Sequence, residues 1–361
     1  MIVFGTRPEA IKMCPLVLEL KKSELLETIV CVTGQHKEML RQVLDIFQVE
    51  PDYDLEVMKP GQTLYDITTN VLNGMKEIYE KVKPDVVLVH GDTTTAYVSA
   101  VAAFYQQITV GHVEAGLRTY NLYSPFPEEF NRQEIDVIST LNFAPTETAK
   151  ENLLREGKKP ETIFVTGNTG IDALKTTVKE DYKHPILEWA EGSRLLLITA
   201  HRRENLGQPM HEMFRAIRRI VEEFDDVKAV YPVHLNPRVR EVADEELSGC
   251  DQIKLIEPME AESFHNLMNH SYLILTDSGG IQEEAPSLGK PVLVMRDTTE
   301  RPEGIKAGTL RLVGTSQNTI YDACRELLTD ETVYRTMSET ANPYGDGHAS
   351  ERIRKILEDL A

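Results

Sequence analysis

The chain has little of what marks metal-binding, disulfide-bonded or nucleic-acid-binding proteins. Only four of its 361 residues are cysteines, at positions 14, 31, 250 and 324. They form no CxxC pair, which argues against a metal site and against a disulfide framework. Acidic residues outnumber basic ones by 58 to 39, and the net charge of −19 argues against sequence-independent binding of nucleic acid. No metal is therefore expected.

Long hydrophobic runs are also missing. No apolar run approaches the roughly 20 residues that a helix needs to cross a bilayer. Met1 leads almost at once into a short strand-like run rather than into a signal peptide. We therefore expect a protein of the reducing cytoplasm.

What the chain does contain is a regular alternation of short apolar runs with amphipathic segments of helical period. Runs this apolar are typical of strands covered on both faces, and their alternation with helices indicates parallel sheets built from βαβ units. Two such series predict an α/β protein of two Rossmann-like, doubly wound domains. The runs are 2–4, 28–32, 85–89, 108–113, 141–143 and 163–165, then 195–199, 228–232, 253–256, 272–275, 292–295 and 310–313.

Two interruptions of this pattern predict the domain boundaries. Glycines and small polar residues at Thr166–Asp172 separate an N-terminal domain, 1–168, from a C-terminal domain, 169–347. A glycine–proline break at Asn342–Gly347 precedes a last helix, 348–361, which we expect to pack back on the first domain. Ligands of such folds bind beyond the carboxyl ends of the strands, so functional motifs should follow strands.

The segment TDSGGIQEE is the most informative of these motifs. A buried strand breaks at Asp277-Ser278, Gly279 and Gly280 follow, and a helix is expected from about Ile281. The free N–H groups and positive dipole end of that helix would attract an anion, and the glycines would let a phosphate reach the backbone. The alternative is a helix capped by Ser278, with glycines filling a tight turn.

Basic residues follow the first strand, in GTRPEAIK. Arg7 and Lys12 would project near the carboxyl end of the strand, where they could neutralise a diphosphate. The alternative is that both are ordinary solvated cations. Their place in a loop after a strand favours a function.

Carboxylates follow later strands of the first half. Asp92, in HGDTTT, either caps the next helix or faces a ligand, and Glu114, in HVEAGLRT, stands at a strand end. Glu128 and Glu129 follow in the proline-bounded segment YSPFPEE. For that pair, taken alone, an exposed acidic loop is the simpler interpretation.

Cationic and imidazole side chains follow strands of the second half. His201, Arg202 and Arg203 come directly after one strand, where guanidinium groups beside an imidazole suit anion binding and proton handling. His234 and Arg301 lie in two further loops that follow strands.

Seven motifs in this order give the chain a specific resemblance over essentially its whole length. FGTRPEAIK, HGDTTT, HVEAGLRT, YSPFPEE, HRREN, DSGGIQEE and TTERPEG resemble the bacterial non-hydrolysing UDP-N-acetylglucosamine 2-epimerases. The resemblance implies two Rossmann-like domains of the glycosyltransferase-B type with the active site in the interdomain cleft. It further implies a homodimer without metal or redox cofactor, which interconverts UDP-N-acetylglucosamine and UDP-N-acetylmannosamine for bacterial surface polysaccharide synthesis.

Substrate-binding positions are carried over from the family motifs. The resemblance implies that Ser278, Gly279 and Gly280 hold the diphosphate, with Arg7 assisting from the other domain. Lys12 also matches a ligand-binding position.

Further positions match the family's nucleotide-binding side chains. Glu284 resembles the carboxylate that binds the ribose hydroxyls, and Phe264 the aromatic residue beside uracil. Met259 stands where relatives often have glutamine near the uracil, so only a backbone contact would survive there. Arg301 matches a ligand-binding position.

The substrate explains why several carboxylates are needed. Carbon-2 of the sugar has no adjacent carbonyl, so the resemblance implies elimination of UDP to 2-acetamidoglucal and re-addition from the opposite face. This scheme needs cations for the departing diphosphate and acid–base groups at the sugar. Asp92, Glu114, Glu128 and His201 resemble the family's catalytic residues. An acid–base role shared by the three carboxylates is expected, and which one takes the carbon-2 proton stays open.

Some relatives hold a second UDP-N-acetylglucosamine as an allosteric activator. Glu38 and Gly61 depart from the glutamine and arginine of certain relatives, so we expect a weakened site. The positions that match this regulatory pocket are Gln35, His36, Arg202 and His234.

Three other functions compete with this one. A retaining glycosyltransferase shares the architecture but has less need of carboxylates in the first domain. A hydrolysing epimerase would release free N-acetylmannosamine. A silent nucleotide-sugar sensor would keep SGG and Glu284 but lose the catalytic carboxylates, which are all present.

Overall fold

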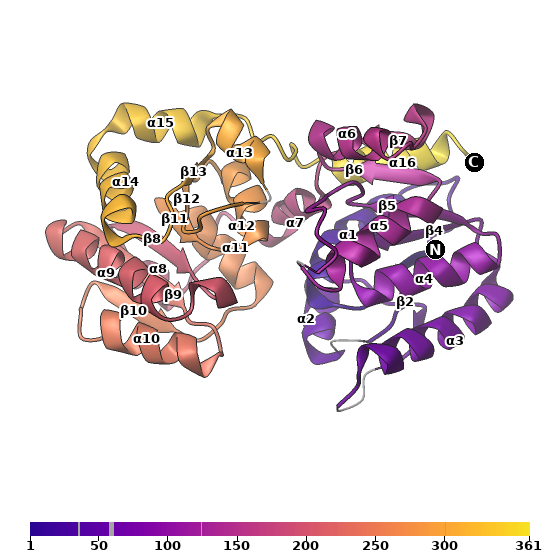
Figure 1. Cartoon of the computed structure of the whole chain (residues 1–361), viewed down its shortest axis with the longest axis horizontal. Coiled ribbons are helices and arrows are strands. Elements are labelled where there is room, and N and C mark those ends of the chain that lie inside the picture. Colours follow the sequence, from indigo (N-terminus) through magenta and orange to yellow (C-terminus); the bar gives the residue numbers. More distant parts are fainter. Residues whose placement is uncertain (35–36, 58–60, 124, 300) are drawn as a thin grey trace. The chain divides into compact units, whose positions relative to one another are not determined.

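The computed structural model describes residues 1–34, 37–57, 61–123, 125–299 and 301–361 of a chain that divides into two compact units (Figure 1). The N-terminal unit comprises Met1–Thr176 and Tyr344–Ala361, and the C-terminal unit comprises Thr177–Pro343. The division thus falls at the end of helix α7 (Thr169–Thr177), whereas the sequence places it before that helix. Among the helices described, none is long and apolar enough to cross a membrane.

The N-terminal unit is built on a parallel sheet of seven strands in the order β3-β2-β1-β4-β5-β6-β7. The order reverses between β1 and β4, and at such a switch point the loops after the two strands diverge and leave room for a ligand. The strands are β1 Ile2–Phe4, β2 Val30–Val32, β3 Tyr53–Asp54, β4 Val86–His90, β5 Thr109–Val113, β6 Leu141–Ala144 and β7 Ile163–Val165.

Helices cover both faces of this sheet. Ile2 and Phe4 of β1 point to one face and join a buried cluster under α1, α2 and α16, whereas Val3 points to the other face, under α3 and α4. This alternation within one strand is why its residues are all apolar. The remaining elements are α1 Arg7–Leu20, α2 Lys37–Phe47, α3 Leu64–Val82, α4 Thr94–Tyr105, α5 Glu128–Ile138, α6 Glu147–Arg155, the 3-10 turn η1 Pro160–Thr162 and α16 Ala349–Glu358.

The last helix, α16, belongs to the N-terminal unit. Its first backbone N–H groups, those of Ala349 and Ser350, donate to the carboxylate of Asp172 at 3.2 and 2.7 Å. Ile353 is fully buried in the same cluster as the α1 side chains. The end of the chain is therefore part of the core of this unit.

The C-terminal unit repeats the design with six parallel strands in the order β10-β9-β8-β11-β12-β13. The switch point lies between β8 and β11. The strands are β8 Arg194–Thr199, β9 Val227–Pro232, β10 Ile253–Ile256, β11 Leu273–Thr276, β12 Val292–Val294 and β13 Leu310–Leu312.

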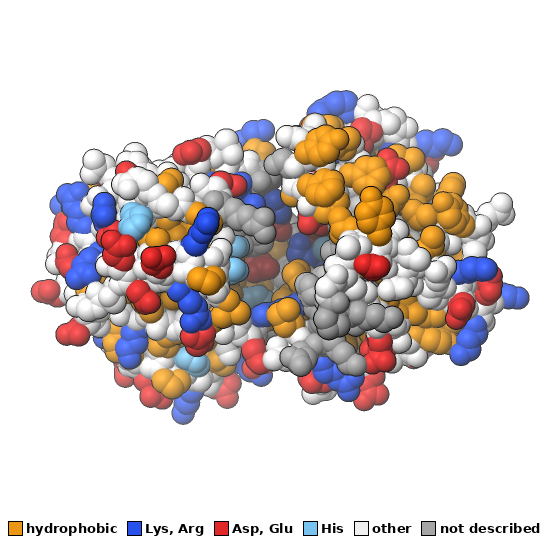
Figure 2. All heavy atoms as spheres, turned by 60° about the horizontal axis from the view of Figure 1, so that its bottom comes forward, with side chains coloured by type: hydrophobic (Ala, Val, Ile, Leu, Met, Phe, Trp, Pro, Cys, Tyr) orange, Lys and Arg blue, Asp and Glu red, His pale blue; other side chains and the backbone are white. Residues whose placement is uncertain are grey.

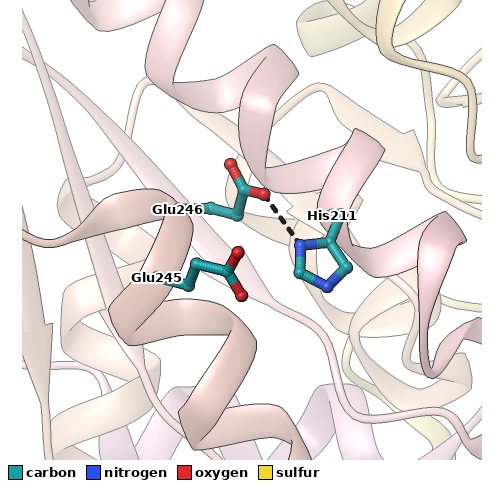
Figure 3. Close-up of side chains that lie close together, drawn as sticks. All are labelled: His211, Glu245 and Glu246. Carbon is teal, nitrogen blue, oxygen red and sulfur yellow. Dashed lines mark hydrogen bonds and ion pairs between the residues drawn. The ribbon is translucent and has the colours of Figure 1, made fainter.

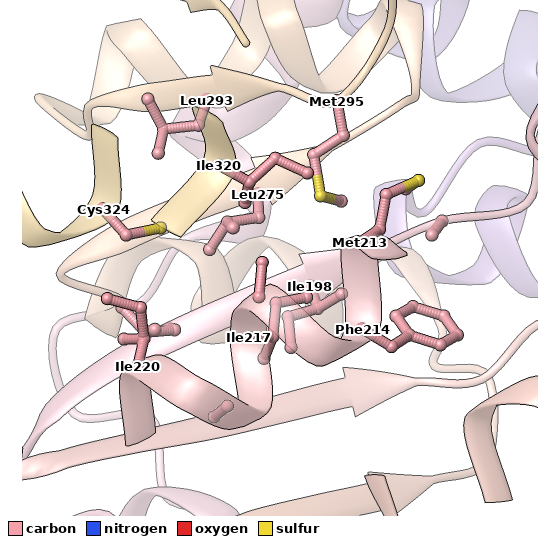
Figure 4. Packing of buried hydrophobic residues seen from close by; sticks show 14 of the residues in the cluster. Ile198, Met213, Phe214, Ile217, Ile220, Leu275, Leu293, Met295, Ile320 and Cys324 are labelled. Carbon is pink, nitrogen blue, oxygen red and sulfur yellow. The ribbon is translucent and has the colours of Figure 1, made fainter. Parts of the chain in front are cut away.

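Its core lies between the sheet and two long helices. Figure 4 shows Phe214 and Ile217 of one helix near Ile198 of β8, with Ile320 and Cys324 of a second helix by Leu293 of β12. The helices and turns are α8 Pro185–Trp189, η2 Arg203–Asn205, α9 Gln208–Glu223, α10 Pro237–Leu247, α11 Ala261–His270, α12 Gly279–Glu284, η3 Ala285–Leu288, α13 Pro302–Ala307, α14 Gln317–Thr329 and α15 Glu331–Glu339.

Candidate active site

Three adjacent strands of the N-terminal unit end in polar residues that the sequence singles out. In sheet order, β1 is followed by Arg7, β4 by Asp92 and β5 by Glu114. Because the strands are parallel, their carboxyl ends meet at one edge of the sheet, and the loops that carry these residues are neighbours.

Glu114 is the most constrained of these residues. Its φ of +70° lies in the left-handed region, which is uncommon for a residue with a side chain. Its carboxylate forms an ion pair with Lys12, accepts a hydrogen bond from Asn168 Nδ2 at 3.2 Å and lies 3.5 Å from His90 Nε2. Burial alone would raise the pKa of Glu114, but the charges of Lys12 and His90 outweigh it and hold the pKa well below its usual range. The group is therefore a carboxylate near neutral pH.

Asp92 is held by two residues of helix α5. Its side chain forms an ion pair with Arg132, and its backbone carbonyl accepts a hydrogen bond from Asn131 Nδ2 at 2.8 Å. The N-cap of α4 is Thr93, whose hydroxyl accepts from the backbone of Ala96 at 3.0 Å. Asp92 is therefore not the helix cap. Its carboxylate is one of the polar groups at the carboxyl ends of β1, β4 and β5.

Glu128 and Glu129 begin α5 and do not form an exposed loop. Glu129 is fully buried and accepts hydrogen bonds from the backbone of Thr119 at 3.0 Å and of Tyr120 at 2.9 Å. Glu128 is half-buried, and within the described residues it forms no ion pair. The simpler interpretation of this pair from sequence is thus wrong: both residues belong to a helix, and Glu129 anchors a loop.

In the C-terminal unit, the glycine motif lies at the start of α12, which begins at Gly279 rather than near Ile281. Ser278 occupies the N-cap position, but its side chain makes no capping hydrogen bond. The guanidinium carbon of Arg301 lies 3.3 Å from the point where a Cβ on Gly279 would stand. Arg301 also donates from Nε to Glu283 at 2.7 Å. A side chain at this position would push the guanidinium away by a few tenths of an ångström.

The loop after β8 is anchored by a fully buried carboxylate, that of Asp277. It accepts hydrogen bonds from the backbone N–H groups of His201 and Arg202, both at 2.9 Å, and from Asn205 Nδ2 at 3.1 Å. The rings of His201 and His234 stack with their centroids 5.5 Å apart. Burial lowers the pKa of His201. The Asp277 carboxylate raises it, but the positive charges of His234 and Arg202 lower it again, so that the pKa stays below its ordinary value. The neutral form of His201 therefore dominates near neutral pH.

A second cluster in this unit surrounds Glu284, at the end of α12. Its carboxylate lies 3.6 Å from Nε2 of the buried His265, whose Nδ1 shares a hydrogen bond of 2.8 Å with the hydroxyl of Thr177. Phe264, the neighbour of this histidine on α11, is half-buried, and so is Met259, which precedes the helix. These side chains place a carboxylate and an aromatic ring on neighbouring elements.

Several residues of these clusters were not singled out from the sequence. Arg132 lies one helical turn after Glu128, a spacing that could have revealed it. Asp277 directly precedes the glycine motif but was interpreted only as a strand break. His90 begins the motif HGDTTT and Asn168 lies in the interruption Thr166–Asp172, but only the fold brings the two residues to Glu114. Of the residues predicted from sequence, Gln35 and His36 lie outside the described residues.

One other cluster of metal-ligand type lies away from the strand ends. His211 of α9 and Glu245 and Glu246 of α10 approach one another in Figure 3, and His211 Nδ1 lies 2.7 Å from a Glu246 carboxylate oxygen. Arg215 contacts the same carboxylate at 2.7 Å. This guanidinium already balances the charge of Glu246, so ion pairing between two helices accounts for the cluster.

Two doubly wound units in one chain, each with polar loops at its strand ends, define an α/β protein of the glycosyltransferase-B type. A model of the UDP-N-acetylglucosamine 2-epimerase family matches residues 18–358, and the chain belongs to this family. The fold class and the family predicted from the motifs are thus confirmed.

The chain is similar to named relatives over nearly their whole length. A UDP-N-acetylglucosamine 2-epimerase of Bacillus subtilis (strain 168) is 62% identical over 360 residues, which cover 100% of this chain and 94% of that protein. The solved structure of S. aureus MnaA with UDP shares 52% identity, with a TM-score of 0.92 over 100% of this chain and 96% of that one. The UDP-GlcNAc 2-epimerase of Neisseria meningitidis, solved with UDP-GlcNAc bound, shares 49% identity, with a TM-score of 0.90 and coverage of 99% of each chain.

Proposed function

We propose that the protein is an isomerase, a non-hydrolysing epimerase that reversibly converts UDP-N-acetylglucosamine to UDP-N-acetylmannosamine in the cytoplasm, for bacterial surface polysaccharide synthesis. The observation that carries this proposal is found in a member of this family: one unit has carboxylates at two strand ends and a third at the start of α5, and the other unit has an arginine against the backbone of a glycine. The relatives named for this activity, one of them solved with UDP-GlcNAc, support the choice of substrate.

The mechanism follows from the weak acidity of the carbon-2 proton. UDP leaves carbon-1 as the proton leaves carbon-2, giving 2-acetamidoglucal, and UDP re-adds after a proton is delivered to the opposite face. Arg7, Lys12 and Arg301 would stabilise the charge of the departing diphosphate, and Ser278 with its two following glycines would bind it through the backbone. The proposal requires both units to act on one UDP-sugar.

The residues around each carboxylate indicate which of them exchange a proton with the sugar. Glu114 is a weak base in the free protein, because Lys12 stabilises its ionised form. Asp92 is paired with Arg132, whereas Glu128 has no cation among the described residues. Asp92 and Glu128 are therefore better placed to exchange a proton with the sugar, with His201 assisting and Glu114 fixing the local charge.

Nucleotide recognition is assigned to the cluster around α11 and α12. Glu284, held beside His265, would accept hydrogen bonds from the ribose hydroxyls, and Phe264 would lie beside the uracil. Met259 would contribute its backbone. The similarity to a protein solved with UDP supports this assignment.

Incubation with UDP-N-acetylglucosamine in deuterated water, followed by proton NMR, tests the proposal. We expect both epimers to stay attached to UDP and to acquire deuterium at carbon-2. Free N-acetylmannosamine would indicate a hydrolysing enzyme instead. Retention of the carbon-2 proton, with no second epimer, would exclude epimerisation.

An exposed apolar face supports a homodimer. Figure 2 shows hydrophobic side chains gathered on the N-terminal unit, and α4, α5 and the segment before α5 contribute large exposed ones. Among them, Tyr123 is 82% exposed and its ring stacks on Phe126 at 6.3 Å. A hollow of about 350 Å³ between these elements is lined mainly by apolar groups. Faces of this kind on soluble proteins usually bind a partner, and a second copy of the chain is the simplest one.

Sedimentation equilibrium would test this dimer. The wild-type protein should sediment at about twice the chain mass of 40.9 kDa. Phe126→Asp should sediment as a monomer, because a charge would be buried in the interface. Leu360→Asp, at an exposed position near the chain end, should remain a dimer. A monomeric wild-type protein at micromolar concentration would exclude the assignment.

We also propose that a second UDP-N-acetylglucosamine binds as a weak activator near Arg202 and His234. Both lie at the strand ends of the C-terminal unit, but the Arg202 side chain already donates to the backbone carbonyl of Asp277 at 3.3 Å. An activator would have to compete with this contact, which agrees with a weakened site. Sigmoidal kinetics, together with faster conversion of UDP-N-acetylmannosamine when traces of the other epimer are added, are expected. Hyperbolic kinetics in both directions would contradict the proposal.

A further inference from the structure

One buried carboxylate of the N-terminal unit joins two loops of the candidate site. Glu9, in the first turn of α1, is only 1% exposed. Its Oε2 accepts hydrogen bonds from the backbone N–H groups of Gly5 at 3.1 Å and Thr6 at 2.8 Å. Its Oε1 accepts a hydrogen bond from the hydroxyl of Thr93 at 2.7 Å, across 84 positions of sequence.

This arrangement goes beyond what the helix cap requires. In a capping box, the N3 side chain needs only to accept from the backbone at the N-cap, which here is Thr6. The second oxygen of Glu9 instead binds the loop after β4, the strand next to β1 in the sheet. One carboxylate therefore holds together the loop that leads to Arg7 and the loop that carries Asp92.

Thr93 completes the connection to Asp92. Its hydroxyl donates to Glu9 and accepts from the backbone of Ala96 at 3.0 Å, so its rotation is fixed on both sides. The carbonyl of the preceding residue, Asp92, is bound by Asn131. Two neighbouring bonds thus fix the chain directly after the side chain that the reaction would use.

We propose that Glu9 is a positioning residue of the epimerase reaction, acting through Thr93 to fix Asp92 relative to the loop of Arg7. The inference rests on the proposed function. It assigns Glu9 no contact with the substrate. A shift of about 1 Å in a reacting group is enough to lower a rate by roughly 100-fold. The hydrogen bond between Thr93 and Glu9 should therefore affect turnover more than substrate binding.

Three substitutions test whether the hydrogen bond between Thr93 and Glu9 positions Asp92. Thr93→Val removes the hydroxyl but keeps the shape, and Thr93→Ser keeps the hydroxyl. Thr146→Val is the matched control, since Thr146 caps α6 through Ala149 at 3.2 Å in the same unit. Losing either cap should lower the Tm by a similar amount, because each substitution removes one N-cap hydrogen bond.

The expected result separates positioning from stability. Thr93→Val should lower kcat by about 10-fold with KM changed less than about 2-fold, since the misplaced group acts after binding. Thr93→Ser should restore kcat to near the wild-type value, and Thr146→Val should leave it unchanged. Equal losses in Thr93→Val and Thr146→Val would overturn the inference, and so would an unchanged kcat in Thr93→Val.

A double-mutant cycle adds an independent test. Glu9→Gln weakens the same bonds by removing the charge, and it should lower kcat less in the Thr93→Val background than in the wild type. Additive effects would show that Glu9 acts by another route. If the wild-type protein shows no epimerisation, the proposed function fails; if the wild type is active but the variants behave additively, only this inference fails.

Discussion

The two units share one topology, but their strand ends carry opposite chemistry. In the N-terminal unit, the carboxylates Glu114 and Asp92 are each paired with a cation, Lys12 and Arg132. In the C-terminal unit, Arg301 lies against the backbone of a glycine, and the strand-end carboxylate of Asp277 binds the backbone N–H groups of the loop that carries His201. The shared topology therefore determines only where a site can form. The loop residues determine whether that site favours proton transfer or the binding of an anion.

The largest expected effect concerns the acidic side of this contrast. Glu114→Gln keeps the shape but removes the carboxylate that pairs with Lys12 and fixes the local charge, and we expect kcat to fall by about 10²- to 10³-fold. UDP affinity, measured by calorimetry, should change much less than kcat, because the groups assigned to the uracil and the ribose lie in the other unit. Glu147→Gln, which changes an exposed glutamate of α6, should leave both quantities unchanged. An equally large loss of UDP affinity in Glu114→Gln would contradict the assignment of uracil and ribose binding to the C-terminal unit.

An intermediate effect is expected on the anion-binding side. Arg301→Lys keeps the charge but loses the planar fork that reaches both Glu283 and the glycine backbone. We expect UDP to bind about 10-fold more weakly, as for the loss of one charged hydrogen bond. Arg335→Lys on α15, whose partner is the exposed Glu331, serves as the control and should not change binding. Unaltered UDP affinity in Arg301→Lys would remove this residue from the diphosphate site.

The smallest effect is a pH dependence of stability. The pKa of His201 is lowered from 6.5, mainly by burial, so the unfolded chain takes up this proton at a higher pH than the folded one. Stability from this group is therefore complete above about pH 6.5 and declines as the pH falls below it. Between pH 7.5 and 5.5, the Tm of the wild type should fall about 1–2 °C further than that of His201→Asn, as followed by calorimetry. An equal fall in both proteins would show that His201 is not desolvated.

Most of the fold could be predicted from the sequence because buried parallel strands leave a strong signal. Each of the predicted apolar runs overlaps a strand of the structure. The strand that was missed, β3, has two residues, Tyr53 and Asp54, at the edge of the sheet and only partly buried, so it shows no apolar run. The start of α12 was placed two residues late because glycine is a poor helix former, although the first turn tolerates it.

The candidate site was predicted less completely, and for a different reason. Residues directly after strands, such as Asp92 and Glu114, could be found because the fold dictates where strand ends meet. Their partners could not: Arg132 reaches Asp92 across 40 positions and Asn168 reaches Glu114 across 54. Such contacts depend on side-chain directions that no local pattern specifies. Asp277 was overlooked because a carboxylate that binds backbone N–H groups resembles an ordinary turn residue in the sequence.

The route of the chain has a practical consequence for dissecting this protein. Because α16 supplies the buried Ile353 to the first unit, the C-terminal unit is in covalent terms an insertion between Thr176 and Tyr344. Residues 177–343 form one uninterrupted piece, which we expect to fold when it is expressed alone. The N-terminal unit, by contrast, can be isolated only by joining its two segments, and removing the C-terminal helix would expose its core.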